Sequence, residues 1–145
     1  MHDPKTQAMT IEIIATIGNV IFVSPETLEH LGYACDIRGV HPFVVLDIEC
    51  WDGFTECLVV PLTTKGSRWS AVRVPDEFLR GTDAFCSRAN YVYSAWYAHW
   101  IPAWALLEAT APSPSAWHNG NHLTAEGVRF ALDHIVVPVR APAAR

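Results

Sequence analysis

The first half of the chain alternates between short apolar runs and turn residues. The run Val20–Val23 follows a Gly-Asn pair and ends at Ser24-Pro25, which is typical of a β-strand. Residues 25–41 carry proline, glycine and several charged side chains, so we expect a long loop with a helical turn around Thr27–Leu31. Loops of this length in a small domain are often functional.

Two longer apolar runs, at residues 42–48 and 56–62, flank the Asp52-Gly53 pair. Asp-Gly between two β-branched runs is a strong hairpin-turn signal, so we expect two antiparallel strands. Pairing around this turn brings Pro42 and Pro61 to the same end of the hairpin. Because both runs are almost continuously apolar, the strands are expected to be buried on both faces, as in a small closed barrel or at a dimer seam.

The second half of the chain is less regular. Ala71–Val74 is a fourth short strand that stops at a proline, and the alternation of side chains favours a strand starting near Tyr91. In the same region Trp96, Trp100 and Trp104 are four residues apart, which would give one stripe if the segment were helical. Such a stripe belongs to a core or a dimer seam, or else stacks bases as in proteins that bind single strands.

The last element is a helix. Thr124 is a good N-cap, Leu123 and Val128 fit a hydrophobic staple, and the apolar positions up to Ile135 have helical spacing. Pro138 is expected to stop this helix. Several short strands followed by a helix predict a mainly β fold with α, an SH3-like antiparallel barrel with a C-terminal helix.

Composition narrows the class of protein. The 145 residues are 50% hydrophobic and 17% charged, which predicts one packed domain and excludes a disordered chain. No apolar run is long enough to span a bilayer, and the polar N-terminus lacks the pattern of a secretory signal. We therefore expect a cytoplasmic protein that has no membrane partner.

The net charge of −5 is unevenly distributed. Residues 1–60 carry two basic and nine acidic side chains, whereas residues 65–88 carry five basic and three acidic ones. An acidic protein binds nucleic acid poorly without specificity, because phosphate contacts need concentrated Lys and Arg. A nucleic-acid site in this chain would be local and would lie near its middle.

Cysteine and histidine spacing indicates no cofactor. The four cysteines form no CxxC pair, so we expect free thiols, although Cys50 and Cys57 could face each other across the hairpin as a disulfide. His118 and His122 are four residues apart, but the Gly and Asn between them argue against the helix that a metal pair would need. No metal and no other cofactor is expected.

Three segments line up in order along the chain: Ile17-Gly18-Asn19-Val20-Ile21-Phe22-Val23, then Gly39-Val40-His41-Pro42-Phe43-Val44-Val45-Leu46, then Leu58-Val59-Val60-Pro61-Leu62-Thr63-Thr64. Together they resemble the MazF/PemK toxin family. That family opens with a Gly-Asp strand, reaches Arg-Pro-x-Val-Val-Leu through a mobile loop, and ends its third strand in Val-Pro-x-Thr-Thr. The resemblance implies one barrel domain at residues 16–137, with an N-terminal extension at 1–15 and a tail at 138–145.

This resemblance implies a metal-independent endoribonuclease, the toxin of a toxin–antitoxin pair. Such enzymes cleave single-stranded RNA by attack of a ribose 2′-hydroxyl on the adjacent phosphate. The family's Arg and first Thr move the proton and stabilise the developing charge, and His41 and Thr63 stand at those positions here. Histidine exchanges protons near neutral pH but lacks the permanent charge and planar fork of arginine. The candidates for RNA binding are Arg38, Thr64, Lys65, Arg68 and Arg73.

The resemblance also implies a homodimer and an antitoxin peptide or protein as partner. The alternative is a PemK-like barrel without cleavage activity that serves as a protein-binding or assembly module through its aromatic side chains. The missing arginine and the acidic surface favour this module. The Pro-Leu-Thr-Thr sequence, the basic loop beside it and the long loop favour the enzyme.

Overall fold

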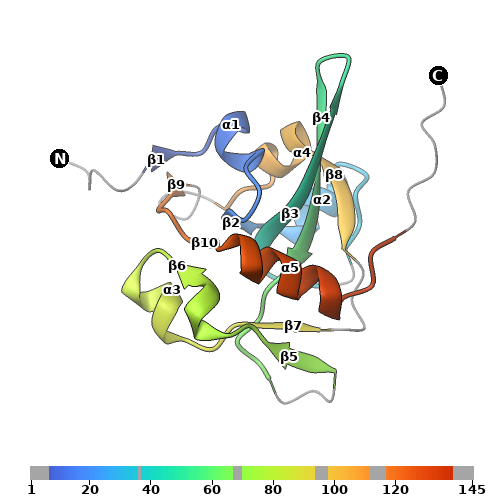
Figure 1. Cartoon of the computed structure of the whole chain (residues 1–145). Coiled ribbons are helices and arrows are strands. Elements are labelled where there is room, and N and C mark those ends of the chain that lie inside the picture. The colour runs from blue at the N-terminus through green and yellow to red at the C-terminus, as the bar shows by residue number, and fades with distance from the viewer. Residues whose placement is uncertain (1–6, 36, 67–69, 94–97, 112–116, 139–145) are drawn as a thin grey trace.

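A central antiparallel sheet organises the fold (Figure 1). The computed structural model describes residues 7–35, 37–66, 70–93, 98–111 and 117–138. The sheet has the strand order β2-β3-β4-β8, with β2 at Val20–Val23, β3 at His41–Trp51, β4 at Phe54–Pro61 and β8 at His99–Pro102. Strands β3 and β4 form a long hairpin whose tip projects from the rest of the domain (Figure 1).

The hairpin confirms the prediction made from the Asp-Gly pair. Asp52 and Gly53 have φ angles of 48° and 74°, the two positive values that a type I′ turn requires. Pro61 pairs with Phe43, and the N–H of Leu62 donates to the carbonyl of Pro42 at 2.8 Å. The two prolines therefore lie at the same end of the hairpin, as expected.

Three two-stranded ladders complete the β-structure, and every pairing among the described strands is antiparallel. They pair β1 (Gln7–Ala8) with β9 (Trp117–His118), β6 (Leu79–Arg80) with β10 (His122–Leu123), and β5 (Ala71–Arg73) with β7 (Tyr91–Tyr93). The strands predicted near residues 71 and 91 are thus confirmed. The described part of the chain is a mixed α/β, mostly antiparallel domain without a closed barrel.

Isolated bridges connect two of these ladders to the central sheet. Asn19, just before β2, pairs with His122 of β10, and Thr63, just after β4, pairs with Tyr91 of β7. The strand pairing therefore continues past both edges of the β2-β3-β4 unit.

In the described residues, five short α-helices and one 3-10 turn accompany the strands. They are α1 (Ile11–Ile14), α2 (Pro25–His30), η1 (Asp76–Phe78), α3 (Asp83–Ser87), α4 (Ala103–Glu108) and α5 (Ala125–His134). The segment expected as a loop with a helical turn contains α2, because Ser24 caps the helix by accepting from the N–H of Thr27 at 3.2 Å and Pro25 pre-sets the first turn. No helix in these described stretches is long and apolar enough to cross a membrane.

The C-terminal helix begins as predicted and ends earlier. The hydroxyl of Thr124 accepts from the N–H of Gly127 at 3.2 Å, which confirms the N-cap. The helix ends at His134, and Ile135 is already extended. The expectation that Pro138 stops this helix is wrong, since the chain leaves the helical conformation before the proline is reached.

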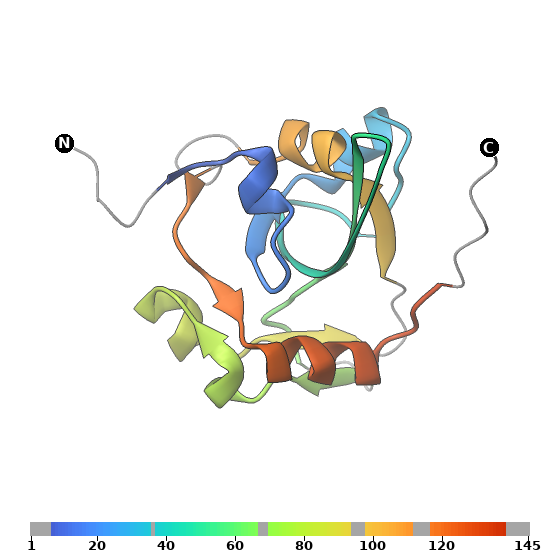
Figure 2. The same ribbon diagram turned by 45° about the horizontal axis from the view of Figure 1, so that its top comes forward.

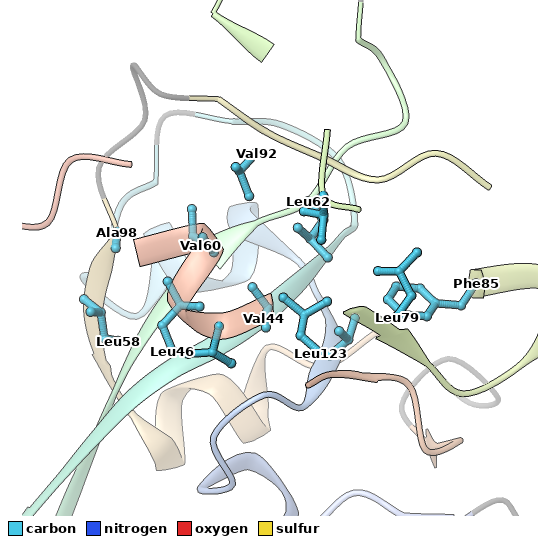
Figure 3. Packing of buried hydrophobic residues seen from close by; sticks show 14 residues of the cluster. Val44, Leu46, Leu58, Val60, Leu62, Leu79, Phe85, Val92, Ala98 and Leu123 are labelled. Carbon is cyan, nitrogen blue, oxygen red and sulfur yellow. The ribbon is translucent and has the colours of Figure 1, made fainter. Parts of the chain in front are cut away.

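Two hydrophobic clusters lie on opposite faces of the central sheet. Figure 2 shows α5 on one side of this sheet and α1, α2 and α4 on the other. Val44, Leu46, Leu58 and Val60 point into the first cluster, with Leu123 and residues of α5 (Figure 3). The alternate residues of the same strands enter the second cluster, which is closed by α1, α2 and α4. Both faces of β3 and β4 are therefore buried, as their apolar runs predict.

Residues 7–15, expected as an N-terminal extension, contain β1 and α1, and the side chain of Ile14 is fully buried in the second cluster. The tryptophan spacing does not mark one helix. Trp100 lies in β8 and Trp104 in α4, with Pro102 at the junction, while Trp96 lies outside the described residues.

Candidate functional site

Four side chains form a row across the strands at one end of the central sheet. Extending the register of Phe43 and Pro61 by two residues brings His41 opposite Thr63. Thr63 pairs in turn with Tyr91, and Tyr91 pairs on its other side with Arg73. Residues directly opposite each other in antiparallel strands project from the same face. We refer to His41, Thr63, Tyr91 and Arg73 as the cross-strand row.

The backbone around His41 fixes its imidazole. Pro42 disfavours the helical conformation for the preceding residue, so His41 begins β3 in an extended conformation. Its Nδ1 atom lies 2.7 Å from the carbonyl oxygen of Gly39. Because a carbonyl can only accept, Nδ1 carries the proton in this arrangement, and in the neutral ring Nε2 is left as the basic nitrogen.

Thr63 is held on both sides. Its backbone groups exchange two hydrogen bonds with Tyr91, at 3.0 and 2.8 Å, and only 9% of the residue is exposed. The side-chain oxygen accepts from the N–H of Lys65 at 3.1 Å. A hydroxyl that accepts one hydrogen bond still has its own proton to donate. The threonine is thus oriented by its neighbour and remains able to donate to an incoming oxygen.

Aromatic side chains clamp the segment that follows Thr63. The hydroxyl of Tyr93 donates to the carbonyl of Lys65. A Cβ atom added at Gly66 would overlap the ring of Tyr91, so this ring lies directly against the backbone there. The exposed side chain of Lys65 therefore projects from a segment whose backbone is fixed beside the cross-strand row.

The predicted cations are differently placed. Arg73 belongs to the row, and its backbone lies two strand spacings, roughly 10 Å, from that of Thr63. Its guanidinium forms an exposed ion pair with Asp76 at 3.1 Å. An exposed pair of this kind is weak and open to exchange with a phosphate. Arg38 is exposed on the segment before His41, and Arg68 lies outside the described residues.

Glu26 is a carboxylate that the sequence did not single out. It accepts from the N–H of Gly39 at 2.9 Å and 3.3 Å, one distance for each oxygen. This hydrogen bond from Gly39 lowers the pKa of the carboxyl below its usual value, and the charges of Arg38 and His41 lower it further. Glu26 thus holds the turn that presents His41, and it adds a negative charge beside the row.

The structure brings together His41, Thr63, Lys65 and Arg73, while Thr64 is exposed directly beside them. Tyr91 and Glu26 were missed by sequence reasoning. Tyr91 carried a strand signal, but no local pattern names its partner strand. Glu26 gave only the signal of an acidic residue in the first turn of a helix, and its partner lies on a different segment.

The other candidates do not form sites. Among the described residues there is no group of three or more side chains suited to a metal ion. Burial lowers the pKa of His118, with a smaller contribution from His122. Cys50 lies opposite Thr55 and Cys57 opposite Ile48, and all four cysteines are free, which confirms the expected free thiols and rules out the alternative disulfide.

Comparison with known proteins assigns no family to this domain. No protein-family model, no curated protein and no solved structure matches the chain. The cross-strand row and its neighbours are therefore the features of this protein that bear on its function.

Proposed function

We propose that this protein is a metal-independent endoribonuclease that acts on single-stranded RNA, with the cross-strand row as its active site. The observation that supports the proposal is the pairing of Phe43 with Pro61, which, extended by two residues, sets His41 opposite Thr63. An imidazole beside a fixed hydroxyl, flanked by a phenol and cations, contains the groups that phosphodiester transfer needs.

The proposed reaction uses only the RNA and these side chains. Nε2 of His41 takes the proton of a ribose 2′-hydroxyl, and the 2′-oxygen attacks the adjacent phosphorus. The bond from phosphorus to the 5′-oxygen breaks and this oxygen takes a proton from water, which leaves a 2′,3′-cyclic phosphate and a 5′-hydroxyl end, while the proton held by His41 returns to solvent. The hydroxyl of Thr63 donates to the non-bridging oxygen that gains charge, and Lys65 and Arg73 attract the strand.

The resemblance extends the proposal to architecture and partners. The bridges at Asn19 and Thr63 continue the pairing of β2-β3-β4 into β10 and β7, which supports an SH3-like barrel that is partly open. A homodimer and an antitoxin peptide or protein are the partners that the resemblance suggests. The toxin role is tested by the effect of expression on growth and its reversal by a co-expressed neighbouring gene.

A second candidate is a barrel that has lost cleavage and binds another protein. Glu26 favours it, since this carboxylate lies beside Arg38 and His41 and repels a phosphate. In that case the exposed Trp104 and Trp117 are candidate contact residues, because exposed aromatic side chains are enriched at interfaces.

The deciding experiment incubates purified protein with an end-labelled single-stranded RNA in EDTA and analyses the product ends. The proposal expects cleavage with cyclic phosphate ends. Thr63→Val keeps the shape and removes the hydroxyl, so cleavage should fall by about 10²-fold or more, whereas Thr63→Ser should retain most of it. Absence of cleavage by the wild type, or equal rates for the two variants, would contradict the proposed site.

A further inference from the structure

A second concave site lies at the outer edge of the central sheet, away from the cross-strand row. The segment after α2 and strand β8 lie side by side there (Figure 1 and Figure 2), and a pocket of about 430 Å³ opens between them. Tyr33 contributes to one wall, His99, Trp100 and Ile101 to the other, and Pro138 to the rim. This volume is within the range of small-molecule sites, about 300–1,000 Å³.

Both walls are fixed by the fold. The N–H of Tyr33 donates to the carbonyl of Leu28 at the end of α2, at 2.8 Å, and the ring of Tyr33 packs edge-on against Trp104 with centroids 6.1 Å apart. On the other wall, His99 pairs with Val59 and Trp100 with Leu58 of β4. The pocket is therefore largely formed before a ligand arrives, which lowers the entropic cost of binding.

The lining selects a type of ligand. None of the described residues that line the pocket is Asp, Glu, Lys or Arg, so a charged group gains no partner from them. Tyr33 and His99 bring aromatic rings to the side of β8 that carries Ile101, whereas the ring of Trp100 packs against the first cluster, and flat rings stack on aromatic surfaces. The Tyr33 phenol adds a polar atom that can hydrogen-bond to the edge of a ring.

The pocket also borders the candidate active site along the chain. Tyr33 belongs to the same connecting segment as Arg38 and Gly39, which lead into His41. On the other wall, Val59, the partner of His99, lies two residues before Pro61 on the strand that leads to Thr63. The two sites are therefore connected through the chain segments that form both walls of the pocket.

We propose that the pocket between Tyr33 and Trp100 binds a neutral planar heteroaromatic ring, specifically a nucleobase. The base comes either from a free nucleoside or from the RNA strand held at the row. Only the second source rests on the proposed function. The sugar of either ligand, and the phosphates of the RNA strand, stay outside, where the pocket opens to solvent.

The test titrates adenosine into the full-length protein and follows backbone amide resonances, with ribose as the ligand that lacks a base. Saturable shifts at Tyr33, Ala98 and His99 are expected with adenosine and not with ribose. Tyr33→Ala should weaken adenosine binding by about tenfold or more. Trp117→Ala, which removes an exposed tryptophan from β9, is the matched control and should leave the affinity unchanged.

An RNA oligonucleotide with a single abasic position, moved stepwise along the strand, separates the two sources. If removing the base at one position weakens RNA binding to the wild type but not to Tyr33→Ala, the pocket holds a base of the RNA strand. If removing the base has no effect on RNA binding at any position, the pocket holds the base of a free nucleoside. If adenosine binds and RNA is not cleaved, the pocket stands and the proposed function fails. Absence of saturable adenosine binding, or equal losses in Tyr33→Ala and Trp117→Ala, would overturn the inference. Thermal unfolding of each variant checks that it is folded.

Discussion

Thr63 and Tyr91 form a complete antiparallel hydrogen-bonded pair. The N–H of Thr63 donates to the carbonyl of Tyr91 at 3.0 Å, and the N–H of Tyr91 donates back at 2.8 Å. Because Tyr91 also pairs with Arg73, this one contact joins the hairpin β3–β4 to the ladder β5–β7 and places a hydroxyl, a phenol and a guanidinium on one line. The position of the hydroxyl therefore depends on the ladder as well as on its own strand.

Two substitutions of His41 distinguish proton transfer by this side chain from the effect of a positive charge at its position. His41→Ala should reduce RNA cleavage by about 10²- to 10⁴-fold, the usual effect of removing an acid–base group. The wild-type rate should depend on pH, because a side chain that takes the proton acts in only one of its protonation states. His41→Arg should retain or raise activity and lose that dependence, as measured by single-turnover rates at several pH values. If His41→Arg cleaves RNA and the wild type does not, the histidine at this position prevents cleavage and is not the group that takes the proton.

The contact between Gly66 and Tyr91 predicts a non-additive pair of substitutions. Gly66→Ala drives a methyl group into the Tyr91 ring and should destabilise the fold by about 1–3 kcal/mol. In the background of Tyr91→Ala the same change should cost much less, because the ring is gone. Urea unfolding of the four proteins measures the coupling. Additive losses would mean that the ring is not the obstacle.

Salt dependence reports the cations beside the row. The logarithm of affinity for a single-stranded oligonucleotide should fall with the logarithm of salt concentration, by about 0.7 for each phosphate neutralised. Lys65→Ala or Arg73→Ala should lower this slope by about one such step. Arg80→Ala is the control, because that guanidinium donates to the carbonyls of Glu77 and Leu79, each at 2.8 Å, outside the row. Equal effects of all three substitutions would argue against a local groove.

The Glu26 carboxylate makes stability depend on pH. Its pKa is lower in the folded protein than its usual value of 4.5, mainly because Gly39 donates to it, so the ionised form stabilises the fold. This contribution is complete above about pH 4.5 and is lost as the pH falls through the lowered pKa. Glu26→Gln should therefore lower the urea midpoint at pH 7, and the difference from wild type should shrink in acid. Glu29→Gln, on the same helix, is the matched control. A difference that grows in acid would contradict the assignment.

Thiol reactivity should distinguish two cysteines of one hairpin. Burial raises the pKa of Cys57 to about 12, while Cys50 is exposed near the hairpin tip. Only thiolates alkylate quickly, so iodoacetamide at pH 8 should label Cys50 in the native protein and Cys57 only after unfolding. Peptide mass spectrometry measures both sites, and Cys50→Ser checks the assignment. Native labelling of Cys57 at a comparable rate would show that β4 opens readily.

Local signals predicted the elements whose cause is local. The Asp52-Gly53 turn and the Thr124 cap lie beside the residues that they organise, and both were found from sequence. The tryptophan spacing was ambiguous because a strand and a helix meet inside it. Pro102 ends β8 and precedes α4, and a proline inside an apparent helical period is the signal that separates the two readings.

The candidate site shows the same limit. Turn-centred pairing was enough to place His41 near Thr63, since both belong to one hairpin. Tyr91 required knowing which strand follows β4 in space, and Glu26 required the path of the chain between α2 and β3. These are tertiary contacts between separate segments, and no spacing of residues in the sequence predicts them.

The double burial of β3 also governs which length changes the chain tolerates. Val44 and Leu46 belong to one cluster, and Phe43 and Val45 belong to the other. Inserting or deleting one residue there would turn each of these side chains to the opposite face of the sheet, where it would not fit the cluster that it meets. The pairing shifts register between Val45 and Asp47, and most of the residues beyond it are at least partly exposed. Natural variation in length, and any inserted epitope or reporter peptide, is therefore best accommodated at the tip around Asp52.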